Sequence, residues 1–176
     1  MFRLTEPSRL TEFERQVLPH LDAAYNLARF IMRSDQDAED VVQEASLRAF
    51  RFFESFRGEN CRGWFLSIVR NTSFTALKRN RPNEANVVFD EELHGVQSPP
   101  MDAGISLDRA QDRHTVRAAI EQLPVEFREA ITLRELEGCS YKEIADIAGV
   151  PIGTIMSRLA RARRQLQMIL SKTYTK

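Results

Sequence analysis

Apolar residues recur at the spacing of an amphipathic helix through most of the first 80 positions. Helices are therefore predicted at residues 11–32, 37–53 and 62–78. The first apolar stripe is formed by Phe13, Val17, Leu21, Tyr25, Ala28, Ile31 and Met32. The second is formed by Ala38, Val41, Val42, Ala45, Ala49 and Phe53, and the third by Trp64, Phe65, Ile68 and Val69. Three stripes in so short a stretch predict a compact N-terminal bundle of three to four helices.

The helical periodicity disappears between about residues 81 and 106, where proline, glycine and asparagine interrupt an acidic stretch. An irregular acidic linker over 81–106 is predicted between two domains, residues 8–80 and 107–172. About 25 residues would span roughly 30 Å as a coil and about 80 Å when fully extended. The two domains are therefore expected to be able to sit well apart.

Two further helices are predicted at residues 107–122 and 125–137. Pro124 fits the first turn of the second helix, and Gly138 fits its C-terminal cap. The chain is therefore expected to be all-α, with two small helical domains joined by the linker.

The segment after Gly138 has the pattern of a helix-turn-helix. Ser140 and Glu143 match a capping box, in which each side chain bonds the other residue's backbone N–H. Gly149 suits a tight turn, and a second helix is predicted to start near 151–154 and to run through Leu166. The small Ala145 and the inward-facing Ile155 and Leu159 suit two closely crossing helices.

The second helix of such a motif enters the major groove of DNA, with its early residues at the base edges. The outward positions here are Thr154, Met156, Ser157, Arg158 and Arg161, followed by Arg163 and Arg164. The alternative is an ordinary helical hairpin whose arginines form a solvated face. DNA binding is favoured, because the capping box, the turn glycine, the spacing and a basic helix without acids coincide.

Charge is unevenly distributed along a chain whose net charge is zero. From Gly149 onward there are six Lys or Arg residues and no Asp or Glu, whereas residues 35–44 hold five acids and no base. The segregation suggests different partners for different segments. Overall neutrality argues mildly against a protein that binds DNA on its own.

These segments together resemble an extracytoplasmic-function sigma factor of RNA polymerase, a member of the sigma-70 family. The C-terminal half is similar to sigma region 4, which binds the −35 promoter element, over the segment LPVEFREAITLRELEGCSYKEIADIAGVPIGTIMSRLARARRQL. The N-terminal half resembles parts of sigma region 2 over two segments, DAEDVVQEASLRAFRFFESFRG and CRGWFLSIVRNTSFTALKRNR. Two motifs in the family's order across a linker are more specific than a lone helix-turn-helix.

The resemblance implies an alternative sigma factor that binds core RNA polymerase, directs it to promoters and helps to open the −10 element. Contact with the β′ clamp helices is implied for Asp37, Asp40, Val41, Gln43 and Glu44. Binding and melting of the −10 element is implied for Phe56, Arg57, Asn60, Trp64, Arg70, Asn71, Lys78 and Arg79. Binding of the −35 element is implied for Ser140, Tyr141, Thr154, Met156, Ser157, Arg158, Arg161, Arg163 and Arg164. The polymerase β flap and an anti-sigma factor are further implied partners.

Some of these roles have simpler readings. The acidic turn at 35–44 also suits a helix dipole alone, and Trp64 is more often a core residue than a base-stacking one. Asn71 lies where the family has an Asn near the pocket for an extruded base. Met156 departs from the family, which often has a basic residue there, so promoter preference is expected to shift.

One rival hypothesis is a stand-alone helix-turn-helix regulator with an N-terminal dimerisation or partner domain. An enzyme is disfavoured, because no P-loop, nucleophile elbow or dinucleotide motif is present, and the three histidines form no metal-spaced cluster with Cys61 or Cys139. No cofactor is expected, and the cysteines are interpreted as packing or turn residues rather than redox sensors. With no apolar run long enough for a membrane span, a cytoplasmic setting is expected.

Overall fold

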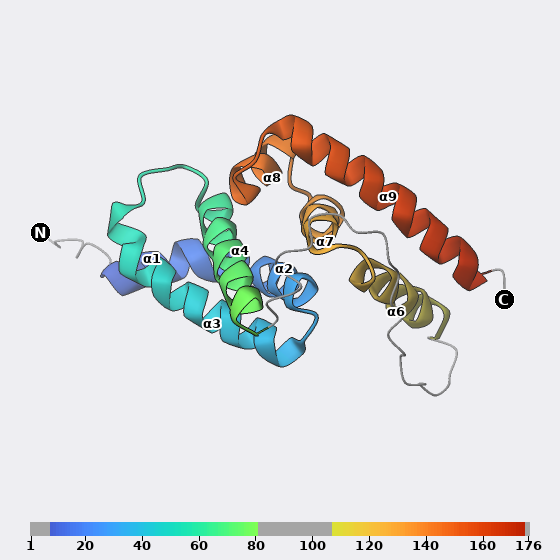
Figure 1. Ribbon diagram of the computed structural model, residues 1–176. Helices are drawn as coiled ribbons and strands as arrows, with labels where there is room; N and C mark the ends of the chain where they lie inside the picture. Colours follow the sequence, from blue (N-terminus) through green and yellow to red (C-terminus); the bar gives the residue numbers. More distant parts are fainter. Residues whose placement is uncertain (1–7, 81–106, 175–176) are drawn as a thin grey trace, which may run out of the picture.

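Helices form in every region where the hydrophobic spacing predicts them. The computed structural model describes residues 8–80 and 107–174, which are helical without strands (Figure 1). The N-terminal half contains α1 (Arg9–Val17), the 3-10 turn η1 (Leu18–His20), α2 (Leu21–Met32), α3 (Asp35–Phe52), η2 (Phe53–Ser55) and α4 (Cys61–Asn80). The C-terminal half contains α6 (Leu107–Glu121), α7 (Val125–Ile131), the π-helical turn η3 (Thr132–Leu136), α8 (Tyr141–Ala148) and α9 (Ile152–Tyr174).

The single helix predicted over 11–32 is wrong, because the chain breaks it at Pro19. The break is the turn η1, which separates α1 from α2. Proline has no backbone N–H to donate and crowds the preceding turn, so a continuous α-helix is unfavourable there. Arg33, in the left-handed conformation with φ 59°, then ends α2, and the Ser34 side chain caps α3.

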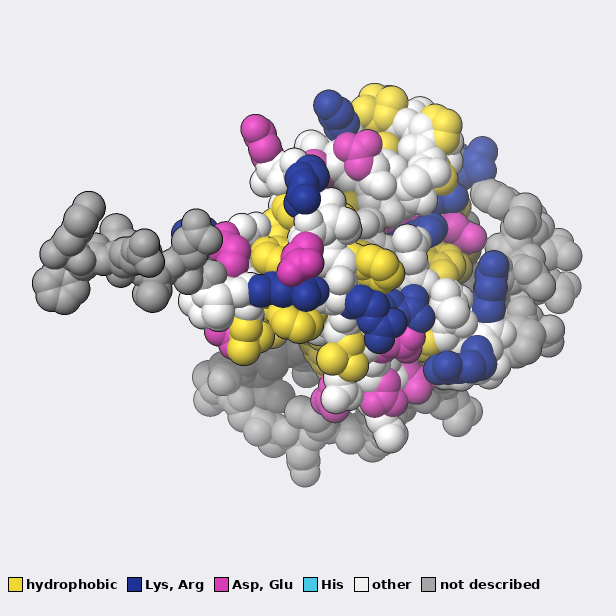
Figure 2. Space-filling model, turned by 90° about the vertical axis from the view of Figure 1, so that its left-hand side faces the viewer, with side chains coloured by type: hydrophobic (Ala, Val, Ile, Leu, Met, Phe, Trp, Pro, Cys, Tyr) yellow, Lys and Arg dark blue, Asp and Glu magenta, His cyan; other side chains and the backbone are white. Residues whose placement is uncertain are grey.

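The N-terminal bundle packs through α2, whose stripe faces both α3 and α4. Leu27 and Ile31 are fully buried there, and Ala45 of α3 lets the helices approach closely. At the far end Phe13 packs edge-on against Phe50, with ring centroids 5.1 Å apart. On the face at which α1 lies, hydrophobic, basic and acidic side chains are interspersed (Figure 2). The apolar stripes therefore close a core, and the charges remain outside it.

The predicted helix-turn-helix is confirmed in its local geometry. The Ser140 hydroxyl accepts a bond from the Glu143 N–H, and the Glu143 carboxylate accepts one from the Ser140 N–H at 2.7 Å. The latter bond lowers the pKa of the Glu143 carboxyl. Gly149 has a φ of 67° and ends α8, a conformation that favours glycine. The second helix, α9, continues to Tyr174, eight residues beyond the predicted end at Leu166.

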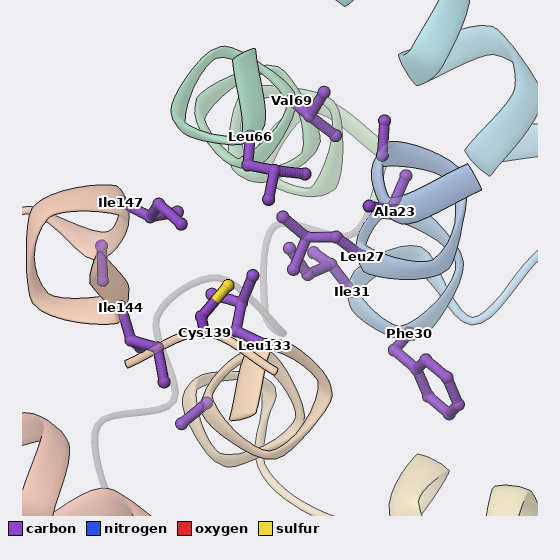
Figure 3. Packing of buried hydrophobic residues seen from close by; sticks show 14 of the residues in the cluster. Ala23, Leu27, Phe30, Ile31, Leu66, Val69, Leu133, Cys139, Ile144 and Ile147 are labelled. Atoms are coloured by element: carbon purple, nitrogen blue, oxygen red, sulfur yellow. The ribbon is translucent and has the colours of Figure 1, made fainter. Parts of the chain in front are cut away.

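The two halves of the chain share one hydrophobic core. Leu27 and Leu66 of the N-terminal half lie beside Leu133, Cys139 and Ile147 of the C-terminal half (Figure 3). Helix α4 packs against α8, and α2 packs against α7. The halves therefore lie together in this arrangement, and the domain division at the linker and the ability of the domains to sit well apart stay predictions.

Replacing Ser140 with alanine is expected to lower the free energy of unfolding by about 1 kcal/mol, because a backbone N–H of α8 loses its acceptor. The urea midpoint of the full chain, followed by circular dichroism, measures this change. Lys142→Ala, at an exposed position in the same turn, is the control and should leave the midpoint nearly unchanged. Equal midpoints for Ser140→Ala and the unmodified chain would show that the capping box does not stabilise the fold.

Candidate functional site

The outward face of α9 carries most of the residues predicted to contact DNA. Ile155 and Leu159 are buried against the rest of the C-terminal half, which turns the opposite side of the helix to solvent. Exposed positions on that side are Ser157, Arg161 and Arg164, and Met156 is exposed at its edge. Thr154 and Arg158 are less accessible, because each is half-buried. The first turns of α9 therefore present a mixed apolar and basic surface.

The arginines of α9 fall into two groups. Arg161 and Arg164 are exposed on the helix. Arg163 is also exposed, but its guanidinium donates to the Glu135 carboxylate at 2.7 Å. Arg158 retains 20% of its side-chain exposure and lies 4.0 Å from a buried carboxylate, that of Glu129. A DNA phosphate would have to compete with these carboxylates for Arg158 and Arg163.

The other two residues predicted to contact the −35 element, Ser140 and Tyr141, make structural contacts within the C-terminal half. Ser140 caps α8 through its hydroxyl. The Tyr141 ring is half-buried and lies beneath the Arg134 guanidinium, 5.0 Å from it. Each side chain thus has a structural partner in addition to the predicted contact with DNA.

A groove lies beside the loop that joins α3 to α4. Its volume is about 720 Å³, and its lining residues are Arg9, Glu12, Gln16, Phe53, Glu54, Phe56, Arg57 and Gly58. Phe56 stacks obliquely on Trp64, with ring centroids 4.7 Å apart and planes inclined by 30°. Trp64 is half-buried, so it belongs partly to the core, as the simpler reading predicted. The sequence indicated Phe56 and Arg57 but gave no sign that α1 forms the opposite wall.

The other residues predicted for the −10 element have different settings. Asn60 accepts the Gly63 N–H through its side chain at 2.8 Å and so caps α4. Asn71, Lys78 and Arg79 are exposed along α4. The last two lie in its final turn, where positive charge suits the helix dipole. These three are the most accessible of the predicted residues on α4.

Arg70 is held away from solvent by the C-terminal half. Its Nε donates to the Glu129 carboxylate at 2.6 Å, and its guanidinium covers the Phe74 ring at 4.2 Å. Its side chain is 19% exposed. The predicted role of Arg70 in DNA contact therefore requires this pairing to break.

Glu129 joins the two predicted DNA-binding surfaces. The carboxylate is 1% exposed, with Oε1 bonded to Arg70 of α4 and Oε2 facing Arg158 of α9. Burial raises the pKa of Glu129, and the neighbouring Arg70 opposes that rise. Removing one member of such a group leaves a buried charge without compensation, which is costly.

Other polar contacts cross between the halves. Arg128 is buried and donates to the carbonyl oxygens of Phe30 at 2.7 Å and Ile31 at 3.0 Å, near the C-terminal end of α2. A cation at that end of a helix is favoured by the dipole. Arg62 of α4 donates to the Glu137 carbonyl oxygen at 2.7 Å. The described arrangement is thus held by directed bonds as well as by apolar packing.

The acidic face of α3 is largely accessible, as predicted for a protein-binding segment. Asp40 and Gln43 are exposed, and Asp37 and Glu44 are half-buried. The Val41 side chain is 3% exposed and packs in the core, so its predicted contact with polymerase, which stays a prediction, would need this side chain to be uncovered. Its place on the apolar stripe of α3 was the signal for this burial.

Two apolar side chains of α3 are exposed, one on its accessible acidic face and one at its C-terminal end on a different side. Leu47 is 65% exposed and Phe52 is 56% exposed. Leu47 follows Gln43 by four positions and so lies on the same side of the helix. Neither residue is among those predicted from the sequence, although the spacing from Gln43 indicates Leu47.

Neither cysteine has the environment of a reactive thiol. Cys61 and Cys139 are free, and burial raises the pKa of both thiols. Over residues 8–80 and 107–174, no three His, Cys, Asp or Glu side chains are grouped as metal ligands. Within the same ranges, no helix has the length and apolar character needed to cross a membrane.

Two family models match the chain. The model of Sigma-70 region 2 matches residues 17–82, and that of Sigma-70, region 4 matches residues 113–166. The ECF RNA polymerase sigma-E factor of Haemophilus influenzae is 38% identical over 148 residues, covering 80% of this chain and 77% of the relative. The protein of the same name in Escherichia coli K12 is 36% identical over 143 residues, covering 74% and 72%.

A solved structure has a similar arrangement of helices. It is the sigma factor RpoE of Bartonella quintana in a co-crystal with the anti-sigma factor NepR, at 30% identity and a TM-score of 0.69. The similarity covers 91% of this chain and 97% of that one.

Proposed function

The chain belongs to the sigma-70 family, in the extracytoplasmic-function group of RNA polymerase sigma factors, and we propose how its residues carry out that function. As an alternative sigma factor it binds core RNA polymerase and directs it to promoters, and the family is one of initiation factors rather than enzymes. The observation that carries the residue assignments is a helix-turn-helix with an acid-free basic helix, joined in one chain to a bundle with an acidic face.

The proposed −35 reader is the domain over residues 107–172. Helix α9 would enter the major groove, with Ser157 and Arg161 at base edges and Arg164 near phosphates. The exposure of these three residues supports the assignment. Arg158 and Arg163 would join the contact after exchanging their carboxylate partners for DNA.

The proposed −10 reader is the loop before α4 together with α4 itself, within the domain over residues 8–80. An extruded base needs a stacking surface and polar partners, and the exposed strand needs positive charge. Phe56 and Arg57 line the groove described above, and Lys78 and Arg79 extend the basic surface along α4. Binding energy would open the DNA, with no bond-breaking step by the protein.

The proposed polymerase contact is the accessible face of α3. Asp40, Gln43 and Glu44 supply polar groups for the β′ clamp helices, and Leu47 adds exposed apolar area of the kind that interfaces bury. The negative charge of this face would also keep it away from DNA. The β flap is the proposed partner of the C-terminal domain, and the cytoplasm is the proposed setting because core polymerase works there.

Promoter binding would require the two halves to separate. The −35 and −10 elements are named for their positions relative to the transcription start, so they lie roughly 25 base pairs apart. This separation is about 85 Å along B-form DNA at about 3.4 Å per base pair. Arg70 and Arg158 instead meet at the single carboxylate of Glu129. The two arginines cannot remain there and also reach elements so far apart. Binding to polymerase would supply the free energy of opening.

An anti-sigma factor is the proposed negative regulator. The similar structure from Bartonella quintana is that of a sigma factor in complex with such a partner. By covering the faces of α3 or α9, an anti-sigma factor would prevent binding to polymerase or to DNA.

In a reconstituted assay, the purified chain is expected to direct transcription only when core polymerase and promoter DNA are both present. The promoter is found by mapping transcription starts after overexpression, and transcript length is the readout. Binding by the chain alone is expected to be weak and to decline with salt, because the contacts are few and mostly to phosphates. Tight, specific binding to duplex DNA without polymerase, and no start site with it, would favour a stand-alone regulator instead.

Glu129→Gln is expected to open the free protein, since the amide keeps the shape of the side chain but loses the charge that holds Arg70. Small-angle X-ray scattering measures this as a rise in the radius of gyration above about 16 Å, the value typical of a compact chain of this size. Arg62→Gln, which acts on the same interface without touching Glu129, should raise it as well.

Glu135→Gln is the matched control for these variants. It removes an exposed carboxylate that pairs with Arg163 within the C-terminal half, so the radius of gyration should not change. Circular dichroism would verify that all variants keep their helices. Compact scattering from both Glu129→Gln and Arg62→Gln would contradict the proposed role of these contacts.

A further inference from the structure

Two exposed apolar side chains lie in the first turns of α9, at the end that would enter the groove. Ile152 is 45% exposed and Met156 is 50% exposed. They are four positions apart, so they lie one above the other on the same side of the helix. Ile155 and Leu159, which follow Ile152 and Met156 by three positions, are buried in the core, so the exposed pair borders the packed side of the helix. The burial of these two neighbours fixes the rotation of the helix and leaves Ile152 and Met156 at the boundary with solvent.

The surroundings of this pair favour DNA as its occupant. Ser157 and Arg161 are exposed next to it, and no acid occurs in the sequence from Gly149 onward. Gly153, next to Ile152 in the same turn, has no side chain, and the space where one would stand is open. A polyanion can therefore approach this surface closely without meeting negative charge on the same helix.

The chemistry of Met156 restricts what it can read. A thioether has no hydrogen to donate, so it cannot form the paired bonds that arginine or lysine makes to guanine. Among the base edges of the major groove, thymine alone carries an apolar group, its C5-methyl. Methionine is flexible and polarisable and so adapts readily to such a contact.

We propose that Met156, with Ile152 beside it, is a specificity-determining residue that selects a thymine in the −35 element through its C5-methyl group. The proposal rests on the function assigned above, in which α9 enters the major groove. It adds an apolar contact to the polar reading by Ser157 and Arg161.

Substitution of deoxyuridine for thymine tests the proposal, because it removes the methyl group and keeps the base pair. Each thymine of the mapped −35 element is replaced singly, and binding of the polymerase complex is measured by competition. One position is expected to lose about three- to fivefold in affinity, the value of one methyl group removed from water. With the Met156→Ala variant, the ratio of the affinity for the thymine-containing DNA to that for the uracil-containing DNA at that position should fall to about one.

Met168→Ala is the matched control, since Met168 is 53% exposed on the same helix but lies three turns beyond Met156. This variant should keep the full methyl effect, which is the loss of affinity when deoxyuridine replaces thymine at the sensitive position. Met156→Arg is expected to shift the preference at this position from thymine to guanine, because a guanidinium can donate to two guanine acceptors.

Three outcomes would overturn the proposal while leaving the sigma function intact. They are transcription with no methyl effect at any −35 position, a methyl effect that survives in Met156→Ala, and a −35 element without thymine. Absence of polymerase-dependent transcription from every mapped start would instead overturn the proposed function, and this inference with it.

Discussion

Burial of the Glu129 carboxylate between Arg70 of α4 and Arg158 of α9 constrains the rest of the structure. A carboxylate that is 1% exposed needs positive charge beside it, and here both positive groups come from surfaces assigned to DNA. Arg128 adds a buried guanidinium bonded to carbonyl oxygens at the end of α2. The apolar contacts between α4 and α8 then complete one core from the two halves. The same interactions that stabilise this arrangement keep two residues that are predicted to bind DNA occupied.

This arrangement fits a protein that depends on a larger complex for its affinity. A chain of zero net charge has little general electrostatic attraction for DNA. Its proposed binding of DNA therefore depends on a few exposed residues of α9 and α4. The acidic and apolar face of α3 lies outside the contact between the halves and stays accessible in the closed form. Polymerase can therefore bind first, and the free energy of that binding can offset the loss of the contacts at Glu129 and Arg128.

Local features could be predicted from the sequence because their causes are local. The capping box at Ser140 and the turn at Gly149 depend on residues within ten positions of one another, and both have the predicted geometry. The burial of Val41 followed from its place on the apolar stripe, and the break at Pro19 from the missing N–H of proline. Contacts across the halves left no such signal. Arg70 meets a residue 59 positions away, and the spacing of apolar residues cannot reveal which helices pack together.

We expect the closed arrangement, in which the two predicted DNA-binding faces meet at Glu129, to open when the protein binds polymerase. Pulsed electron resonance between spin labels at Thr75 of α4 and Gln167 of α9, both exposed, measures this directly once the two native cysteines are replaced. A single short distance is expected for the free protein, and one longer by several tens of ångströms in the complex with core polymerase and promoter DNA. The same distance in both states would contradict the account.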